Sequence, residues 1–79
     1  MPSTVIASFR YFETRRELEV VFRSRRIYAY RNVPLETAQA MKAMFSKGEF
    51  FNLHIRDRYE FERRSDAAPD EPTLEWKGR

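Results

Sequence analysis

The stretch Glu17-Leu18-Glu19-Val20-Val21-Phe22 decides the fold of this 79-residue chain. Leu18, Val20 and Phe22 recur at every second position, and two glutamates and a valine fill the positions around them. Side chains of a strand alternate between the two faces of a sheet, so this period is typical of a strand with one buried face. We therefore predict a strand over residues 17–22 whose three large apolar side chains enter a core.

Two further strands are predicted on either side of this one. Residues 5–11 place Phe9 and Tyr11 on one face and Ile6 on the opposite, more polar face. Residues 27–31 place two tyrosines on one face. The connections between the three strands are short, which favours an antiparallel meander. The two arginine-rich loops of a meander lie at opposite ends of the sheet, so their arginines cannot form one patch.

A helix is predicted after Pro34, because its fixed φ and missing N–H suit a first helical turn. Apolar side chains then recur at helical spacing over residues 35–45. The stripe consists of Leu35, Ala38, Met41 and Phe45. Gly48 is a natural stop for this helix, which is expected to cover the apolar face of the sheet.

The remaining chain is less regular. Phe51 and Ile55 are four residues apart, as on a short second helix, and a short strand is predicted over residues 59–61. The predicted fold class is α+β, with a three- or four-stranded antiparallel meander sheet packed against one main helix and a short second helix.

From Ser65 onward the composition is linker-like, and Leu74 and Trp76 stand alone in a polar segment. We therefore expect a domain over residues 1–64 and a polar, flexible C-terminal tail over residues 65–79.

Composition excludes several classes of protein. A chain this short has room for one core, and it has no cysteine for disulfides, cysteine–zinc sites or thiol catalysis. No apolar run approaches the roughly 20 residues of a membrane span. The first residues lack the basic and long apolar regions of a secretory signal. We expect a cytoplasmic protein without a membrane partner.

The net charge of +3 conceals an asymmetry. Residues 1–64 hold 13 Lys and Arg against 8 Asp and Glu, a net charge of +5, whereas residues 65–79 hold 2 against 4. Arginine supplies 12 of the 15 cations, and its planar fork suits phosphate and carboxylate. The pattern fits an anionic partner, and it equally fits a solvated surface of mixed charge.

No conventional catalytic constellation is visible. His54 is the only histidine, and Ser46, eight residues before it, belongs to no recognised nucleophile motif. The only two glycines, Gly48 and Gly78, exclude a glycine-rich phosphate loop. We expect no enzyme activity, no cofactor and no metal.

Two stretches of the chain resemble the KTSC domain, a small module found as stand-alone bacterial proteins and at the C-termini of some lysyl-tRNA synthetases. They are Tyr28-Ala29-Tyr30-Arg31-Asn32-Val33-Pro34 and residues 46–55, within a resemblance that covers residues 3–59 and begins at Ser3. Phe12 and Asn32 depart from the usual pattern, in which an acidic or amide residue and a glycine are common. The resemblance implies no established activity, but attachment to a tRNA-handling enzyme suggests proximity to RNA.

The leading functional hypothesis is a non-catalytic module that contacts RNA or another anionic partner through cations and aromatic rings. The candidate nucleic-acid-binding residues are Arg10, Arg31, Arg56, Arg58 and Tyr30. Three further positions of the family motif are small or polar and are not explained by core packing: Ser46, Gly48 and Asn52. Each also has a plain structural interpretation, the first two as helix-ending residues and Asn52 as a local cap.

The alternative is a protein–protein interaction or homo-oligomerisation module, and the oligomeric state is left open. An uncovered outer sheet face would be its contact surface, carrying Ile6, Val21, Ile27 and Ala29. Leu74 and Trp76 form a second candidate, as a short docking motif or as residues that fold back over the domain.

Overall fold

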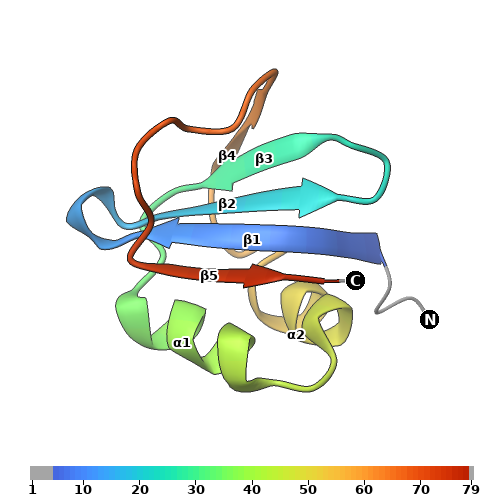
Figure 1. The fold of residues 1–79 in the computed structure, drawn as a ribbon. Helices are drawn as coiled ribbons and strands as arrows, with labels where there is room; N and C mark the ends of the chain where they lie inside the picture. The colour runs from blue at the N-terminus through green and yellow to red at the C-terminus, as the bar shows by residue number, and fades with distance from the viewer. Residues whose placement is uncertain (1–4, 79) are drawn as a thin grey trace.

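The computed structural model describes residues 5–78 and confirms an α+β fold (Figure 1). A five-stranded antiparallel sheet, in the order β4-β3-β2-β1-β5, is covered on one face by two helices. The elements are β1 (Ile6–Phe12), a 3-10 turn η2 (Glu13–Arg15), β2 (Glu17–Phe22), β3 (Ile27–Tyr30), α1 (Leu35–Ala43), α2 (Lys47–His54), β4 (Phe61–Arg64) and β5 (Leu74–Lys77). Ser3 lies outside the described residues, and no described helix is long and apolar enough to cross a membrane.

The predicted meander is present in β1, β2 and β3. Phe9 lies opposite Val20, and Leu18 lies opposite Tyr30, so their side chains form the core between the sheet and the helices. The prediction for Ile6 is wrong, because its side chain is 1% exposed and belongs to this core. The register of β1 shifts between Ile6 and Ser8, and such an irregularity brings Ile6 onto the same face as Phe9.

The helical segment is divided differently from the prediction. α1 ends at Ala43, and Phe45, predicted as part of the buried stripe, is fully exposed. Gly48 does not end α1 as predicted, because it lies within α2, where it is buried. Ser46 begins α2 instead of ending α1, since its hydroxyl oxygen accepts a hydrogen bond from the Glu49 N–H at 3.4 Å.

The sheet gains one strand at each edge. β4 pairs with β3 and begins at Phe61, so the predicted fourth strand exists but lies further along the chain. β5 was not predicted: it pairs with β1, and the ring of Trp76 lies 6.1 Å from that of Phe9. Residues 74–77, expected in a flexible tail, are therefore a strand of the same sheet.

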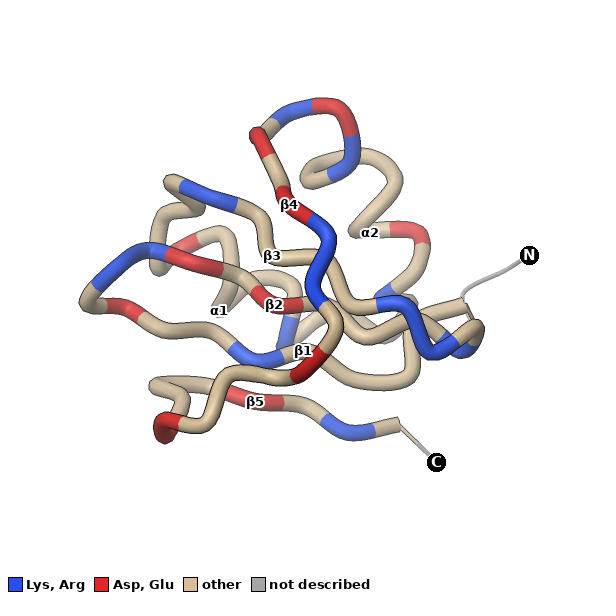
Figure 2. The backbone as a smooth tube through the Cα atoms, turned by 90° about the horizontal axis from the view of Figure 1, so that it is seen from above, with Lys and Arg blue, Asp and Glu red and all other residues tan. Residues whose placement is uncertain are grey.

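Residues 65–73, which we call the crossing segment, run from β4 to β5 over the outer face of the sheet (Figure 2). Glu19 on that face is fully buried and accepts a hydrogen bond from the Ala68 N–H at 2.8 Å. Arg10 donates to the carbonyl oxygens of Ala68 and Asp70, at 2.8 and 2.6 Å. Ala29, expected on an open contact surface, is fully buried.

Candidate functional site

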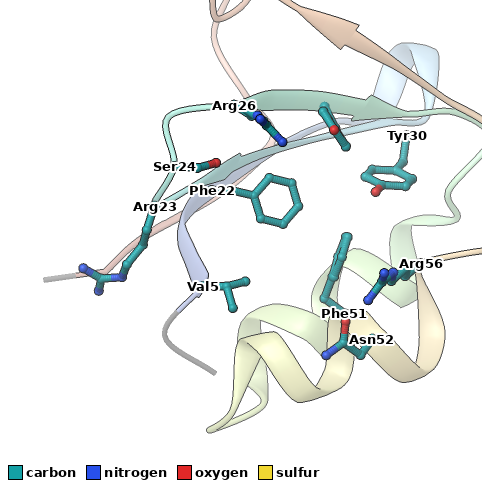
Figure 3. A pocket seen from close by; sticks show the side chains of 10 residues that line it. Val5, Phe22, Arg23, Ser24, Arg26, Tyr30, Phe51, Asn52 and Arg56 are labelled. Atoms are coloured by element: carbon teal, nitrogen blue, oxygen red, sulfur yellow. The ribbon is translucent and has the colours of Figure 1, made fainter. Parts of the chain in front are cut away.

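A pocket of about 410 Å³ opens between the β2–β3 turn and α2 (Figure 3). Four of its residues are aromatic, three are arginines, and the others are small or polar. They are Val5, Phe22, Arg23, Ser24, Arg26, Tyr28, Tyr30, Phe51, Asn52 and Arg56. We call this the aromatic pocket.

The floor of the aromatic pocket is a set of rings packed edge to face. The centroid of the Phe51 ring lies 5.4 Å from that of Phe22 and 5.4 Å from that of Tyr30, with interplanar angles of 75° and 79°. Phe22 also meets Tyr28, at 5.5 Å and 72°. Phe51 and Tyr30 are buried, whereas Phe22 and Tyr28 remain half-buried and present apolar surface to the pocket. Rings held by one another in this way form a preformed surface.

The rim of the aromatic pocket is cationic. Arg26 enters from the strand side and Arg56 from the end of α2, while Arg23 extends outward from the turn (Figure 3). Among residues 5–78, no carboxylate pairs with the guanidinium of Arg26 or Arg56, and none lines this pocket. The rim therefore offers positive charge to a ligand.

Tyr30 contributes a hydroxyl between the floor and the rim. Burial, with a smaller contribution from the neighbouring Tyr28, raises the pKa of Tyr30 to about 12, although Arg56 acts in the opposite direction. The phenol is therefore protonated near neutral pH and can donate a hydrogen bond.

Two local backbone structures fix the positions of the rim arginines. In the β2–β3 turn the Arg25 N–H donates to the Phe22 carbonyl at 2.8 Å, and the Phe22 N–H donates to the Arg26 carbonyl at 2.9 Å. Arg25 adopts a left-handed φ of 75°, which lets the turn close without glycine. At the end of α2 the Arg56 N–H donates to the Phe51 carbonyl at 2.9 Å, which holds the arginine beside the aromatic floor.

The structure brings together three of the residues singled out from the sequence. Tyr30, Asn52 and Arg56 all line the aromatic pocket, and Arg56 directly follows the second stretch that carries the family resemblance. Sequence reasoning missed Phe22 and Arg26 as site residues. The available signal was the basic turn next to the tyrosines of β3, but the position of α2 beside that turn depends on the tertiary fold.

The other candidates lie elsewhere. Arg10 is held on the outer face by Glu19 and the crossing segment, and Arg31 pairs with Glu62. Arg58 lines a separate hollow beside α1. Ser46 is the cap of α2, and Gly48 is buried within it.

His54 lines the same hollow as Arg58, together with Glu36, and its ring lies 4.6 Å from that of Phe50. Ser46 is not among the residues of this hollow, and no hydrogen bond joins His54 to Glu36 among the described residues. No group of three or more His, Cys, Asp or Glu that could hold a metal occurs between residues 5 and 78. Thr37 supplies a hydroxyl to this hollow, but among residues 5–78 no hydrogen bond joins it to His54.

Comparison with known proteins identifies relatives of this fold and sequence. The sequence profile of the KTSC domain matches residues 2–59. The crystal structure of a KTSC domain protein from Yersinia pestis is similar, with a TM-score of 0.76 and 31% sequence identity. That match covers 81% of this chain and 90% of the Yersinia chain. No curated protein sequence matches the chain.

Proposed function

The chain belongs to the KTSC domain family, and we propose that this member is a non-catalytic module that binds single-stranded RNA through the aromatic pocket. One observation carries the proposal: half-buried rings and the guanidinium groups of Arg26 and Arg56 converge on one open pocket. Proteins that bind single strands combine these two features, because bases stack on aromatic rings while cations contact phosphates.

The polar groups of the aromatic pocket suit a nucleotide. A base stacked on the ring of Phe22 brings its edge near hydrogen-bonding side chains such as Asn52 and the Tyr30 hydroxyl. RNA is recognised in this way through unstacked bases, and its 2′-hydroxyl adds a partner that DNA lacks. The occurrence of the family at the ends of some lysyl-tRNA synthetases supports RNA over DNA by analogy only. The proposal places the protein in the bacterial cytoplasm, where single-stranded RNA is abundant.

The test is a fluorescence titration of a short single-stranded RNA at low salt with the full chain and two variants. Arg56→Gln removes a rim cation and should weaken binding about tenfold, the order expected for a hydrogen bond to a charged group. Arg58→Gln removes the same charge two residues away, outside the aromatic pocket, and should weaken binding less than about twofold.

Binding by the unaltered chain should weaken steeply as salt rises, because phosphate contacts release counterions. Absence of binding at low salt contradicts the proposal. Equal losses from Arg56→Gln and Arg58→Gln contradict the assignment of the site to the aromatic pocket.

One feature favours the alternative of a protein-interaction module. Met44 and Phe45, in the connection between α1 and α2, are 47% and 103% exposed. Three of the residues that the sequence suggested for this role are less suitable, since Ile6 and Ala29 are buried and Trp76 packs against the core. Light scattering decides between monomer and oligomer: an oligomer that Phe45→Ser dissociates supports the alternative, and a monomer counts against self-association.

A further inference from the structure

A second hollow, of about 530 Å³, lies beside the aromatic pocket. It is formed by the β2–β3 turn and the end of β4, and it is lined by Ser24, Arg25, Arg26, Arg63, Arg64 and Ser65. We call it the arginine hollow. Ser24 and Arg26 line both the arginine hollow and the aromatic pocket, so the two sites are contiguous across the turn.

The position of the arginine hollow follows from the pairing of β3 with β4. Arg63 lies opposite Tyr28, and Arg64 lies opposite Ile27, the residue that follows the turn. Strand pairing therefore places these two arginines beside the first two residues of β3, next to the turn that carries Arg25 and Arg26. Figure 2 shows the two basic segments, one at the end of β4 near the centre and the other in the turn at the right.

The charges of the arginine hollow are only partly compensated. Arg64 donates to both carboxylate oxygens of Glu17, at 2.6 and 2.9 Å, and to Glu62 at 2.9 Å. Arg25, Arg26 and Arg63 have no carboxylate partner among residues 5–78, and no acidic residue lines the hollow. Like charges gathered in a concave surface create a positive potential that attracts an anion.

From this arrangement we propose that the arginine hollow is a phosphate subsite for a neighbouring phosphodiester of the strand bound in the aromatic pocket. This inference rests on the proposed function. The recognised unit is then a single-stranded segment of at least two nucleotides. One base stacks in the aromatic pocket, the backbone passes over Ser24 and Arg26, and the next phosphate lies among Arg25, Arg26 and Arg63.

The test compares two ligands, adenosine monophosphate and a single-stranded RNA tetranucleotide, by calorimetry on the full chain. The arginine hollow is altered by Arg63→Gln, with Arg25→Gln as an independent second variant in case the first disturbs β4. Each should weaken tetranucleotide binding about five- to tenfold and change mononucleotide binding less than about twofold. Each should also reduce the magnitude of the slope of log affinity against log salt by about 0.7, the value for one phosphate of a single strand that is no longer neutralised.

Two matched variants separate this inference from the proposed function. Arg56→Gln should weaken the binding of both ligands, and Arg58→Gln should change the affinity for neither. If Arg63→Gln and Arg25→Gln both leave tetranucleotide affinity unchanged while Arg56→Gln lowers it, the subsite is refuted and the aromatic pocket stands. If the unaltered chain binds neither ligand at low salt, the proposed function is refuted and the subsite with it.

Discussion

Glu19 is a buried carboxylate that joins the outer face of the sheet to the crossing segment. Its alternation with Leu18 and Val20 indicates the outer face of a strand, and that face would ordinarily be solvated. In the structure the side chain is fully buried and satisfied by Arg10, at 3.2 Å, and by the Ala68 N–H. Ala68 lies 49 residues further along the chain, so the local alternation of residues 17–22 could not predict this contact.

Replacing this carboxylate should therefore be costly. Glu19→Ala leaves the Arg10 guanidinium and the Ala68 N–H with one acceptor fewer, and we expect a loss of about 2–3 kcal/mol in the free energy of unfolding. Urea denaturation measures it. Glu60→Ala, at an exposed position, is the control and should change stability by about 0.5 kcal/mol or less. A loss as small for Glu19→Ala as for the control would contradict the buried network.

The two departures from the family pattern also have explanations at the scale of single residues. Asn32 has a left-handed φ of 60°, a conformation in which glycine is common and asparagine is tolerated. Phe12 is buried, and the guanidinium groups of Arg10 and Arg15 lie 5.1 and 4.1 Å from the centre of its ring. Both residues therefore fit their positions, Phe12 at the end of β1 and Asn32 in the loop after β3.

Among the strands, β5 is the one that the sequence did not predict. Leu74 and Trp76 have the correct period for a strand, but four residues after two prolines are too short to distinguish a strand from a tail. The pairing with β1 is a long-range contact, and only the tertiary structure supplies it. The three central strands, by contrast, were predictable because each carries enough alternating apolar residues.

β5 also closes one side of the core. The ring of Trp76 packs on Phe9, and the ammonium group of Lys47 lies 5.1 Å from the centre of the Trp76 ring. Burial lowers the pKa of Lys47, whose Nζ also donates to the Met44 carbonyl. The start of α2 and the last strand are therefore packed together.

Removing the indole should loosen this edge of the fold. Trp76→Ala deletes a partly buried aromatic side chain, and we expect a loss of about 2–3 kcal/mol in the free energy of unfolding, below the range for fully buried rings. Thermal or urea unfolding measures the loss, with Lys77→Ala as the exposed neighbouring control. Equal stability of Trp76→Ala and the unaltered chain would show that β5 does not support the core.

At the scale of the whole molecule, the two ends of the sheet differ in how their arginines are used. The β1–β2 turn and the β2–β3 turn lie at opposite ends, as the meander predicts (Figure 1). At the first end Arg15 is paired with Asp70 and lies near Glu17. At the second end Arg25 and Arg26 meet no described carboxylate. Arg16 at the first end also pairs with no described carboxylate, so the second end holds more, but not all, of the positive charge available to a ligand.

This asymmetry could be predicted only in part. The excess of arginine and the separation of the two loops follow from the sequence. The selection of Tyr30, Asn52 and Arg56 as candidate site residues also follows from it. Which cations are neutralised depends on the crossing segment and on β4. The groups of these two segments bind partners that are distant in the sequence, and such contacts cannot be predicted from local patterns. For this reason the sequence also suggests Arg10 and Arg31 as ligand-binding residues, although in the structure both bind groups of the protein itself.

The most direct measurement of the central claim is an amide chemical-shift titration of the ¹⁵N-labelled full chain with a short single-stranded RNA at low salt. We predict that the largest shifts occur in the β2–β3 turn, in Tyr28 and Tyr30, and around Asn52 and Arg56. Amides near Arg10, and those of α1 beside the hollow that contains Arg58, should move little. No shifts at low salt, or shifts centred on Arg10 or on α1, would contradict the assignment of RNA binding to the aromatic pocket.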